Sequence, residues 1–125
     1  MPVIFQVALG GAIGASLRYL TVLFSVHMLG KDFPYGTMLV NMIGSFIMGL
    51  LSVYLLHRLG HDRFAPFLMT GLLGGFTTFS AFSLDTIALL EKGRVIAAGG
   101  YVVGSVGLSV LMLLAGVLWM RSILS

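Results

Sequence analysis

The stretch GGFTTFSAFS, residues 74–83, places aromatic rings beside hydroxyl groups in an otherwise apolar region. At helical spacing the rings share one face and the hydroxyls share the neighbouring face; the rings are Phe76, Phe79 and Phe82, and the hydroxyls are Thr77, Ser80 and Ser83. Hydroxyls donate hydrogen bonds and ring edges carry partial positive charge, so both groups can face an anion without a full charge. The alternative is a phenylalanine packing stripe whose neighbouring hydroxyls bond back to carbonyls of their own helix.

Gly74 and Gly75 open this stretch and predict a break in its helix. Glycine weakens a helix, and the hydroxyls that follow compete for local carbonyls. Carbonyls freed within a bilayer are costly unless another group satisfies them. Such a break is tolerated where it lines a cavity or binds an ion, and we expect it near mid-membrane.

Small and polar side chains also recur at intervals of four along two other apolar segments. The two sets are Asn41, Ser45 and Gly49, and Tyr101, Ser105 and Ser109. Such stripes either line a polar cavity or join helices through hydrogen bonds, and the spacing fits both. Asn41 is the stronger candidate for a site, since a buried carboxamide needs several partners.

Charged residues within the apolar segments are few. Arg18 is costly at a helix centre, so it should face water, an anion or a partner group, or snorkel from the end of its span. Asp85 lies toward the end of its segment, where a solvated carboxylate and a functional one both fit. The first two segments hold no carboxylate, which argues against a small proton-coupled exporter of cationic drugs. His57, His61 and Asp62 have the spacing of a helical metal site, but they lie in a polar connector.

These candidates belong to a chain that is 58% hydrophobic and only 9% charged, too few charges to cover a water-soluble surface. Each of four continuous apolar runs has about the 20 residues that cross a bilayer: residues 3–26, 37–56, 66–90 and 95–120. We therefore predict an all-α integral membrane protein, with a single four-helix transmembrane domain over residues 1–125. The few basic residues form no cluster, so nucleic acid is not expected as a partner.

The connectors carry a balanced charge once Arg18 is left aside. On the side of the N-terminus lie Arg58, Arg63 and Arg121, and on the opposite side lie Lys31, Lys92 and Arg94. Because an excess of Lys and Arg marks the cytoplasmic side, this tie favours neither insertion. We therefore predict dual topology and an antiparallel homodimer, which would give a short chain the inverted symmetry that longer transporters hold within one chain. The alternative is a coincidence in a chain with few charges.

Pairs of small residues four apart indicate close helix packing. The pairs are Gly10 and Gly14, Ser45 and Gly49, and Gly100 and Gly104. Small side chains let helix backbones approach in lipid, where apolar side chains alone give little driving force.

The opening stretch, together with GGAIGASLR at residues 10–18 and GTMLVNMIGS at residues 36–45, resembles the small fluoride channel family known as Fluc or CrcB proteins. The likeness covers nearly the whole chain, with the motifs in the expected order. It implies an antiparallel dual-topology homodimer in a bacterial inner membrane, with paired narrow pores through which fluoride leaves the cytoplasm. Hydrogen fluoride crosses lipid and dissociates inside the cell, so a passive exit for the anion suffices.

The resemblance also implies roles for individual residues. Phe79 and Phe82 match the family's pore phenylalanines, whose ring edges line the pore. Asn41 matches the pore asparagine, and Ser80 matches the neighbouring hydroxyl. Arg18 matches an arginine of the aqueous vestibule, while Tyr101 and Ser105 match the start of a hydroxyl track.

The family's broken third helix holds a structural sodium ion at the dimer interface through backbone carbonyls, which map to Gly74 and Thr77. Asp85 stands where the family often has glutamate and Ala81 where it often has threonine, so the polar track departs from the family pattern on that side.

Two other classes of function stay open. An ion-coupled small membrane transporter would move fluoride only with a proton or sodium gradient, and a non-transporting membrane assembly subunit would conduct nothing.

Overall fold

The computed structural model describes residues 2–58 and 64–125, and gives side chains for all of these except 56–58. The described part of the chain contains helices joined by short connectors and no strand. Its elements are α1 (Val3–Leu29), α2 (Tyr35–Arg58), the π-helix η1 (Pro66–Leu73), α3 (Gly74–Phe76), α4 (Phe79–Glu91) and α5 (Val95–Leu124). In this part of the chain, four helical segments are long and apolar enough to cross a membrane: Val3–Leu29, Tyr35–Leu55, Pro66–Glu91 and Val95–Leu124. The all-α class and the four predicted spans are confirmed.

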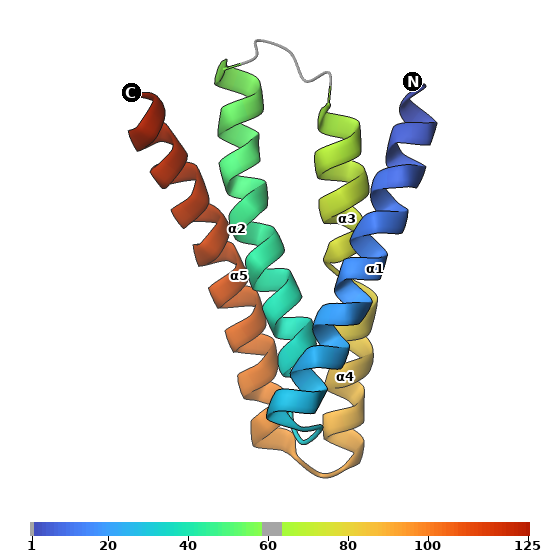
Figure 1. The fold of residues 1–125 in the computed structure, drawn as a ribbon. Coiled ribbons are helices and arrows are strands. Elements are labelled where there is room, and N and C mark those ends of the chain that lie inside the picture. The colour runs from blue at the N-terminus through green and yellow to red at the C-terminus, as the bar shows by residue number, and fades with distance from the viewer. Residues whose placement is uncertain (1, 59–63) are drawn as a thin grey trace.

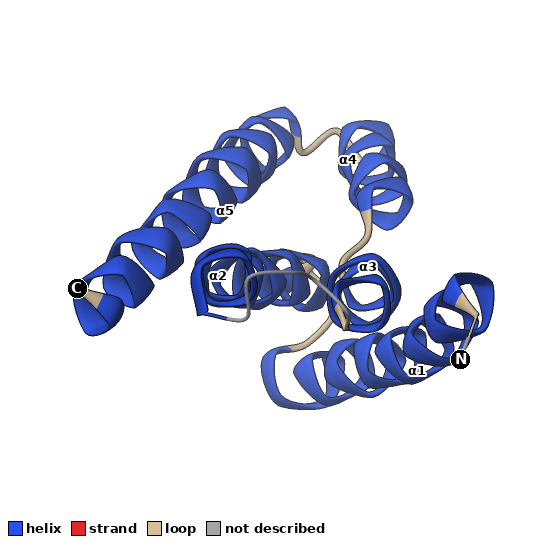
Figure 2. Ribbon diagram, turned by 90° about the horizontal axis from the view of Figure 1, so that it is seen from above, coloured by secondary structure: helices blue, strands red, loops and turns tan. Residues whose placement is uncertain are grey.

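The helices form a bundle in which both termini lie at the same end (Figure 1). The connectors around residues 30–34 and 92–94 lie at the other end (Figure 1). Viewed from above, α1 packs on η1 and α3, while α2 packs along α5, which also contacts α4 (Figure 2). Apolar side chains cover the outer faces, as shown by Ile96, 91% exposed, and Leu84, 70% exposed. A bilayer or a protein partner gives such side chains the apolar surroundings they need, so the chain is a multi-pass membrane protein.

The third membrane-length segment contains a short stretch of extended backbone. α3 ends at Phe76 and α4 begins at Phe79, while Thr77 (φ −87°, ψ 160°) and Thr78 (φ −153°, ψ 123°) between them are extended. The expectation that the helix is interrupted at the two glycines is wrong, because Gly74 (φ −61°, ψ −38°) and Gly75 are both helical. Below, residues 77–78 are called the extended pair.

The glycines of α1 instead allow close contact between helix backbones. A Cβ atom added at Gly14 would lie 2.0 Å from the Leu72 carbonyl oxygen, and one added at Gly10 would lie 2.5 Å from that of Phe67. Gly75 faces back in the same way, with its added Cβ 2.7 Å from the Gly11 carbonyl oxygen. The predicted Gly10–Gly14 packing is confirmed, and Gly75 contributes to packing.

A second pair of glycines joins α2 to α5. A Cβ added at Gly49 would lie 2.2 Å from the Leu113 carbonyl oxygen, and one at Gly116 would lie 2.3 Å from that of Phe46. The predicted role of Gly49 is confirmed, and Gly116 is its counterpart on α5. Gly100 and Gly104 do not bring backbones together within the chain: an added Cβ at Gly100 meets nothing within 4 Å, and at Gly104 only a Met38 methyl at 3.4 Å.

A glycine also ends α4 and orients the connector to α5. Gly93 has a positive φ of 77°, and its N–H donates to the Leu90 carbonyl. The Arg94 N–H donates to the Leu89 carbonyl, which completes the 6→1 and 5→2 pattern of a Schellman cap. The Arg94 guanidinium donates to the Asp32 carbonyl, so the two connectors at this end are tied together.

Candidate functional site

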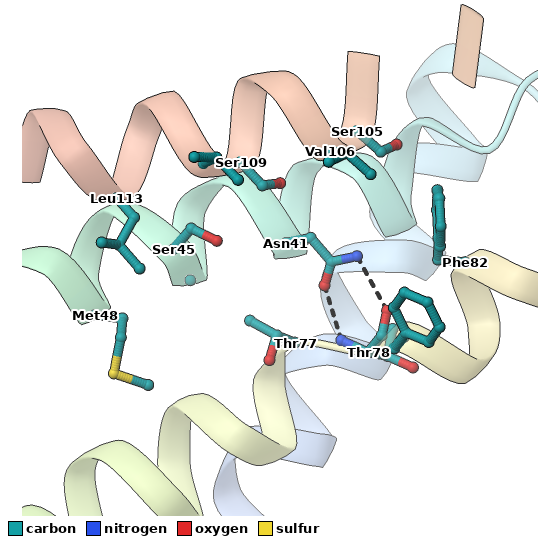
Figure 3. A pocket seen from close by; sticks show the side chains of 13 residues that line it. Asn41, Ser45, Met48, Thr77, Thr78, Phe82, Ser105, Val106, Ser109 and Leu113 are labelled. Atoms are coloured by element: carbon teal, nitrogen blue, oxygen red, sulfur yellow. Dashed lines mark hydrogen bonds between the residues drawn. The ribbon is translucent and has the colours of Figure 1, made fainter. Parts of the chain in front are cut away.

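A cavity of about 310 Å³ lies between α2, α5 and the extended pair (Figure 3). Much of its lining is apolar, including the rings of Phe79 and Phe82. Its polar lining residues are Asn41, Ser45, Thr77, Thr78, Ser105 and Ser109. The cavity thus gathers polar residues from three segments that the sequence analysis considered separately.

Asn41 binds the backbone of Thr78 through both ends of its carboxamide (Figure 3). The Thr78 N–H donates to Asn41 Oδ1 at 2.8 Å, and Asn41 Nδ2 donates to the Thr78 carbonyl at 3.0 Å. This pairing resembles one rung of an antiparallel sheet, because an extended residue presents its N–H and C=O on the same side. Asn41 therefore holds the extended pair against α2, in addition to lining the cavity.

Two carbonyls around the extended pair lose their helical donors. In a continuous helix the Thr78 N–H would donate to the Gly74 carbonyl, but here it donates to Asn41. The Ala81 N–H would likewise donate to the Thr77 carbonyl, but it donates to Thr78 Oγ1 at 3.2 Å, which caps α4. The residues whose carbonyls are released, Gly74 and Thr77, are the two that the sequence analysis associated with a cation.

Arg18 lies beside the end of α3. Its Nε donates to the Gly75 carbonyl at 3.0 Å, and the residue is half-buried. A cation is favourable at the C-terminal end of a helix, where unpaired carbonyls gather. Of the alternatives considered for Arg18, the structure shows pairing with a partner group, the Gly75 carbonyl. Its predicted place in an aqueous vestibule stays a prediction.

Aromatic rings continue from the cavity toward the connector end of the bundle. Phe79 is 76% exposed, and its ring centroid lies 5.5 Å from that of the buried Phe82. Phe82 lies 5.2 Å from Tyr101, which meets Phe33 edge-on at 5.4 Å. The expectation that Phe76 shares a face with Phe79 and Phe82 is wrong, because the extended pair separates it from α4.

The hydroxyl of Tyr101 points to a carboxylate. Tyr101 is fully buried, and its hydroxyl donates to Asp85 Oδ2 at 3.1 Å. Thr37 Oγ1 donates to the same oxygen at 2.8 Å. Asp85 is therefore held inside the bundle. Thr37 was missed by the sequence analysis, although it lies one turn before Asn41 on the same stripe of α2.

Two serines of α5, Ser105 and Ser109, have buried hydroxyl oxygens. Ser105 is 4% exposed, and the oxygens of Ser105 and Ser109 have no hydrogen-bond partner within the described part of the chain. Ser80 differs, because its hydroxyl is exposed and lies 3.4 Å from Thr78 Oγ1. Ser105 and Ser109 both line the cavity, and their hydroxyl oxygens are buried beside it without a partner in the described chain.

Other hydroxyls of the GGFTTFSAFS stretch bond to their own segment. Thr77 Oγ1 donates to the Leu73 carbonyl at 3.0 Å, and Ser83 Oγ donates to that of Phe79 at 3.1 Å. The packing alternative thus describes these two hydroxyls, whereas Ser80 has a different partner. The hydroxyls in this stretch therefore do not form one uniform donor face.

No group of three His, Cys, Asp or Glu side chains that could hold a metal occurs in residues 2–55 and 64–125. The candidate formed by His57, His61 and Asp62 lies outside the described side chains.

Comparison with known proteins identifies relatives of the chain over most of its length. Residues 5–117 match the sequence profile of the family described as "CrcB-like protein, Camphor Resistance (CrcB)". The chain is 58% identical over 118 residues to the fluoride-specific ion channel FluC of Cereibacter sphaeroides (strain ATCC 17029 / ATH 2.4.9), covering 94% of each protein. It is 49% identical over 120 residues to the protein of the same name from Rhizobium meliloti (strain 1021), covering 95% of this chain and 96% of the relative. Paracoccus denitrificans (strain Pd 1222) has a third protein of this name, 54% identical over 111 residues.

Proposed function

The chain belongs to the CrcB family, and we propose that it is a fluoride-selective ion channel that lets the anion leave the cytoplasm passively. The observation that carries this proposal from the structure is the pair of uncommitted hydroxyls, Ser105 and Ser109, buried in a cavity that also holds Asn41. No covalent chemistry is required. The bacterial inner membrane is the proposed location, since cytoplasmic fluoride has to cross it to leave the cell.

Selectivity follows from the kind of donors that the cavity offers. Fluoride is small and tightly hydrated, so a pore must replace its lost water with strong and closely spaced donors. The hydroxyls of Ser105 and Ser109 and the ring edges of Phe79 and Phe82 supply such groups without a full charge. Chloride is larger and more weakly hydrated, so it would fit less well and gain less from the same donors.

We further propose that the extended pair is a functional break near mid-membrane that binds a structural sodium ion. The residues fit this ion, because the Gly74 and Thr77 carbonyls have lost their helical donors and unwound carbonyls are typical sodium ligands. Gly74 is exposed in the single chain, so its backbone is accessible to a partner. When bound, sodium supplies positive charge that satisfies these oxygens.

The assembly that we propose is an antiparallel dual-topology homodimer. Phe79 lines the cavity and is also 76% exposed, so one chain leaves this side of the cavity open. A second copy covering that side would exclude lipid and narrow the passage. We also propose that Ser80 and Tyr101 lie beside the path of the anion, and that Arg18 lies in the aqueous vestibule at its entrance.

Efflux from liposomes tests the function directly. The purified protein is reconstituted in vesicles loaded with potassium fluoride and potassium chloride, valinomycin is added, and both anions are followed with electrodes. We expect rapid fluoride release without chloride and without an imposed proton gradient. Fluoride release that requires a proton or sodium gradient would favour the coupled transporter, and no release from folded protein would favour the assembly subunit.

A further inference from the structure

We infer that Asn41 is a positioning residue for the proposed cation site, in addition to lining the cavity. Its carboxamide binds both backbone groups of Thr78, and this keeps the Thr78 N–H away from the Gly74 carbonyl. The inference rests on the proposed sodium site, but concerns a contact within this chain. It assigns the interruption of the helix to a residue 37 positions earlier in the sequence.

The geometry of the pairing determines the orientation of the Asn41 side chain. The Thr78 N–H can only donate and the Thr78 carbonyl can only accept, so Oδ1 must face the first and Nδ2 the second. The two distances, 2.8 and 3.0 Å, are those of full hydrogen bonds. The pairing matches an extended residue, since a helical Thr78 would direct its N–H and C=O in opposite directions along the helix axis.

Without this pairing the chain has a simple alternative. If Thr78 rejoined the helix, its N–H would donate to the Gly74 carbonyl and satisfy both groups. Gly74 would then no longer offer a carbonyl without its helical donor. Asn41 makes the extended state competitive, because it supplies an acceptor and a donor that a bilayer would not.

Thr78 provides the second half of the same arrangement. Its hydroxyl accepts from the Ala81 N–H at 3.2 Å, which leaves the Thr77 carbonyl without its helical donor. This cap requires Thr78 to be outside the helix, which is the state that Asn41 stabilises. One side chain of α2 therefore influences both carbonyls of the proposed site.

The same residue connects the cation site with the anion cavity. Asn41 lines the cavity, and the pairing with Thr78 uses only one of the two Nδ2–H groups. A substitution at Asn41 is therefore expected to change sodium binding as well as conduction. A residue that only lined the pore would change conduction alone.

The test measures sodium binding without measuring flux. Thermal unfolding of the purified protein is followed while sodium replaces N-methylglucamine at constant ionic strength. For a ligand that binds only the folded state, the free energy of unfolding starts to rise once the ligand concentration reaches the dissociation constant. Fitting this rise gives an apparent dissociation constant for sodium, which is called the sodium midpoint below. We expect Asn41→Ala to move the sodium midpoint at least about tenfold higher than in the wild type, or to abolish the response.

Ser45→Ala is the matched control, because Ser45 lies one turn along α2 and lines the same cavity without binding Thr78. It should keep the sodium midpoint of the wild type. Asn41→Leu serves if the alanine variant does not fold: it keeps nearly the same side-chain size without a charge, but offers Thr78 neither an acceptor nor a donor. Its sodium midpoint should rise at least about threefold.

The outcomes separate this inference from the function that it builds on. A wild-type midpoint in whichever Asn41 variant folds would overturn the inference and leave the sodium site standing. A wild type whose stability does not respond to sodium would overturn both the site and the inference. Fluoride efflux in the liposome assay is independent of either result, so the channel proposal is judged separately.

Discussion

At the scale of single residues, the two rings that line the cavity, Phe79 and Phe82, differ in how much they contribute to packing. Phe79 is largely exposed in the chain, whereas Phe82 is 9% exposed and packs between Phe79 and Tyr101. An effect at Phe79 therefore reports on the pathway more directly than one at Phe82. If both rings instead belong to a packing stripe, a substitution at either one should reduce stability and not conduction.

Phe79→Ile keeps an apolar side chain but removes the ring edge from the cavity. We expect fluoride efflux to fall at least about tenfold, while the free energy of unfolding changes by less than about 0.5 kcal/mol, as for a substitution away from the core. Phe82→Ile should reduce efflux and also destabilise the fold by about 1–3 kcal/mol, because a buried aromatic contact is lost. Fluoride efflux and the free energy of unfolding, measured for both variants, test these expectations. Normal conduction by a destabilised Phe79→Ile would support the packing alternative.

The hydrogen bond from Tyr101 to Asp85 connects α5 to α4 inside the bundle. Tyr101→Phe leaves one donor, Thr37, on a partly buried carboxylate that had two. We expect a loss of about 1.5–3 kcal/mol in the free energy of unfolding, the usual range for a hydrogen bond to a charged group. Denaturant titration in mixed micelles measures this, with Tyr54→Phe as the control because Tyr54 is exposed. If both variants lost the same free energy of unfolding, the hydrogen bond from Tyr101 to Asp85 would add nothing to stability.

Sequence reasoning named several residues that the structure brings to one cavity, but it did not predict their contacts. Asn41, Ser105 and the two rings were identified because polar or aromatic groups at helical spacing are visible in one segment at a time. Their partners, such as Thr78 for Asn41 and Thr37 for Asp85, lie 37 and 48 residues away. Such pairs depend on how helices pack, and no local pattern contains that information.

At the scale of helices, the same limit explains why Gly74 and Gly75 were expected outside a helix. Glycine lowers local helix propensity, so Gly74 and Gly75 were the obvious place for a break. Gly75 is instead helical and lies against the α1 backbone, where a larger residue would collide with Gly11. The four spans were predicted correctly because apolar length alone determines them. The backbone of Thr78 in the extended pair is hydrogen-bonded to Asn41 in another helix.

Two glycines three residues apart in α1, Gly11 and Gly14, allow a controlled test of helix packing. Gly14→Ala would bring its Cβ within 2.0 Å of the Leu72 carbonyl oxygen, so the helices must separate. We expect a loss of about 1–3 kcal/mol, the usual cost of overpacking. Gly11→Ala is the control: its Cβ meets nothing within 4 Å, and replacing a helical glycine should gain about 0.5–1 kcal/mol. Unfolding of both variants in detergent measures the difference. A neutral Gly14→Ala would mean that α1 shifts freely on η1.

At the scale of the whole molecule, the structure groups the connector charges by end. Lys31, Lys92 and Arg94 lie in the connectors at the end opposite the two termini, whereas Arg121 is in the last turn of α5 (Figure 1). Arg58 and Arg63 lie outside the described side chains, but α2 ends at Arg58 on the side of the termini (Figure 1). The three-to-three tie in the sequence therefore corresponds to two ends of one bundle. Neither insertion is favoured by the rule that basic residues stay in the cytoplasm.

This balance predicts that single charge changes bias the orientation. Lys31→Gln leaves two basic residues at the connector end against three at the other, so the end with the termini should become cytoplasmic in most molecules. Arg121→Gln should bias insertion in the opposite direction for the same reason. A reporter fused to the C-terminus measures the orientation in cells, and Asp32→Asn is the control because acidic residues contribute little. A wild type found in one orientation only would exclude dual topology.

Combining the two biased variants tests the antiparallel dimer itself. If a functional pair needs both orientations, cells expressing either Lys31→Gln or Arg121→Gln alone should export fluoride poorly and grow poorly on it. Co-expression should restore resistance, because each variant supplies the orientation that the other lacks. Neither substitution touches the cavity, so a loss of resistance could not be attributed to a damaged pore. Poor growth of each variant without rescue on co-expression would exclude the antiparallel pair. Full resistance with either biased variant alone would indicate that a single orientation conducts.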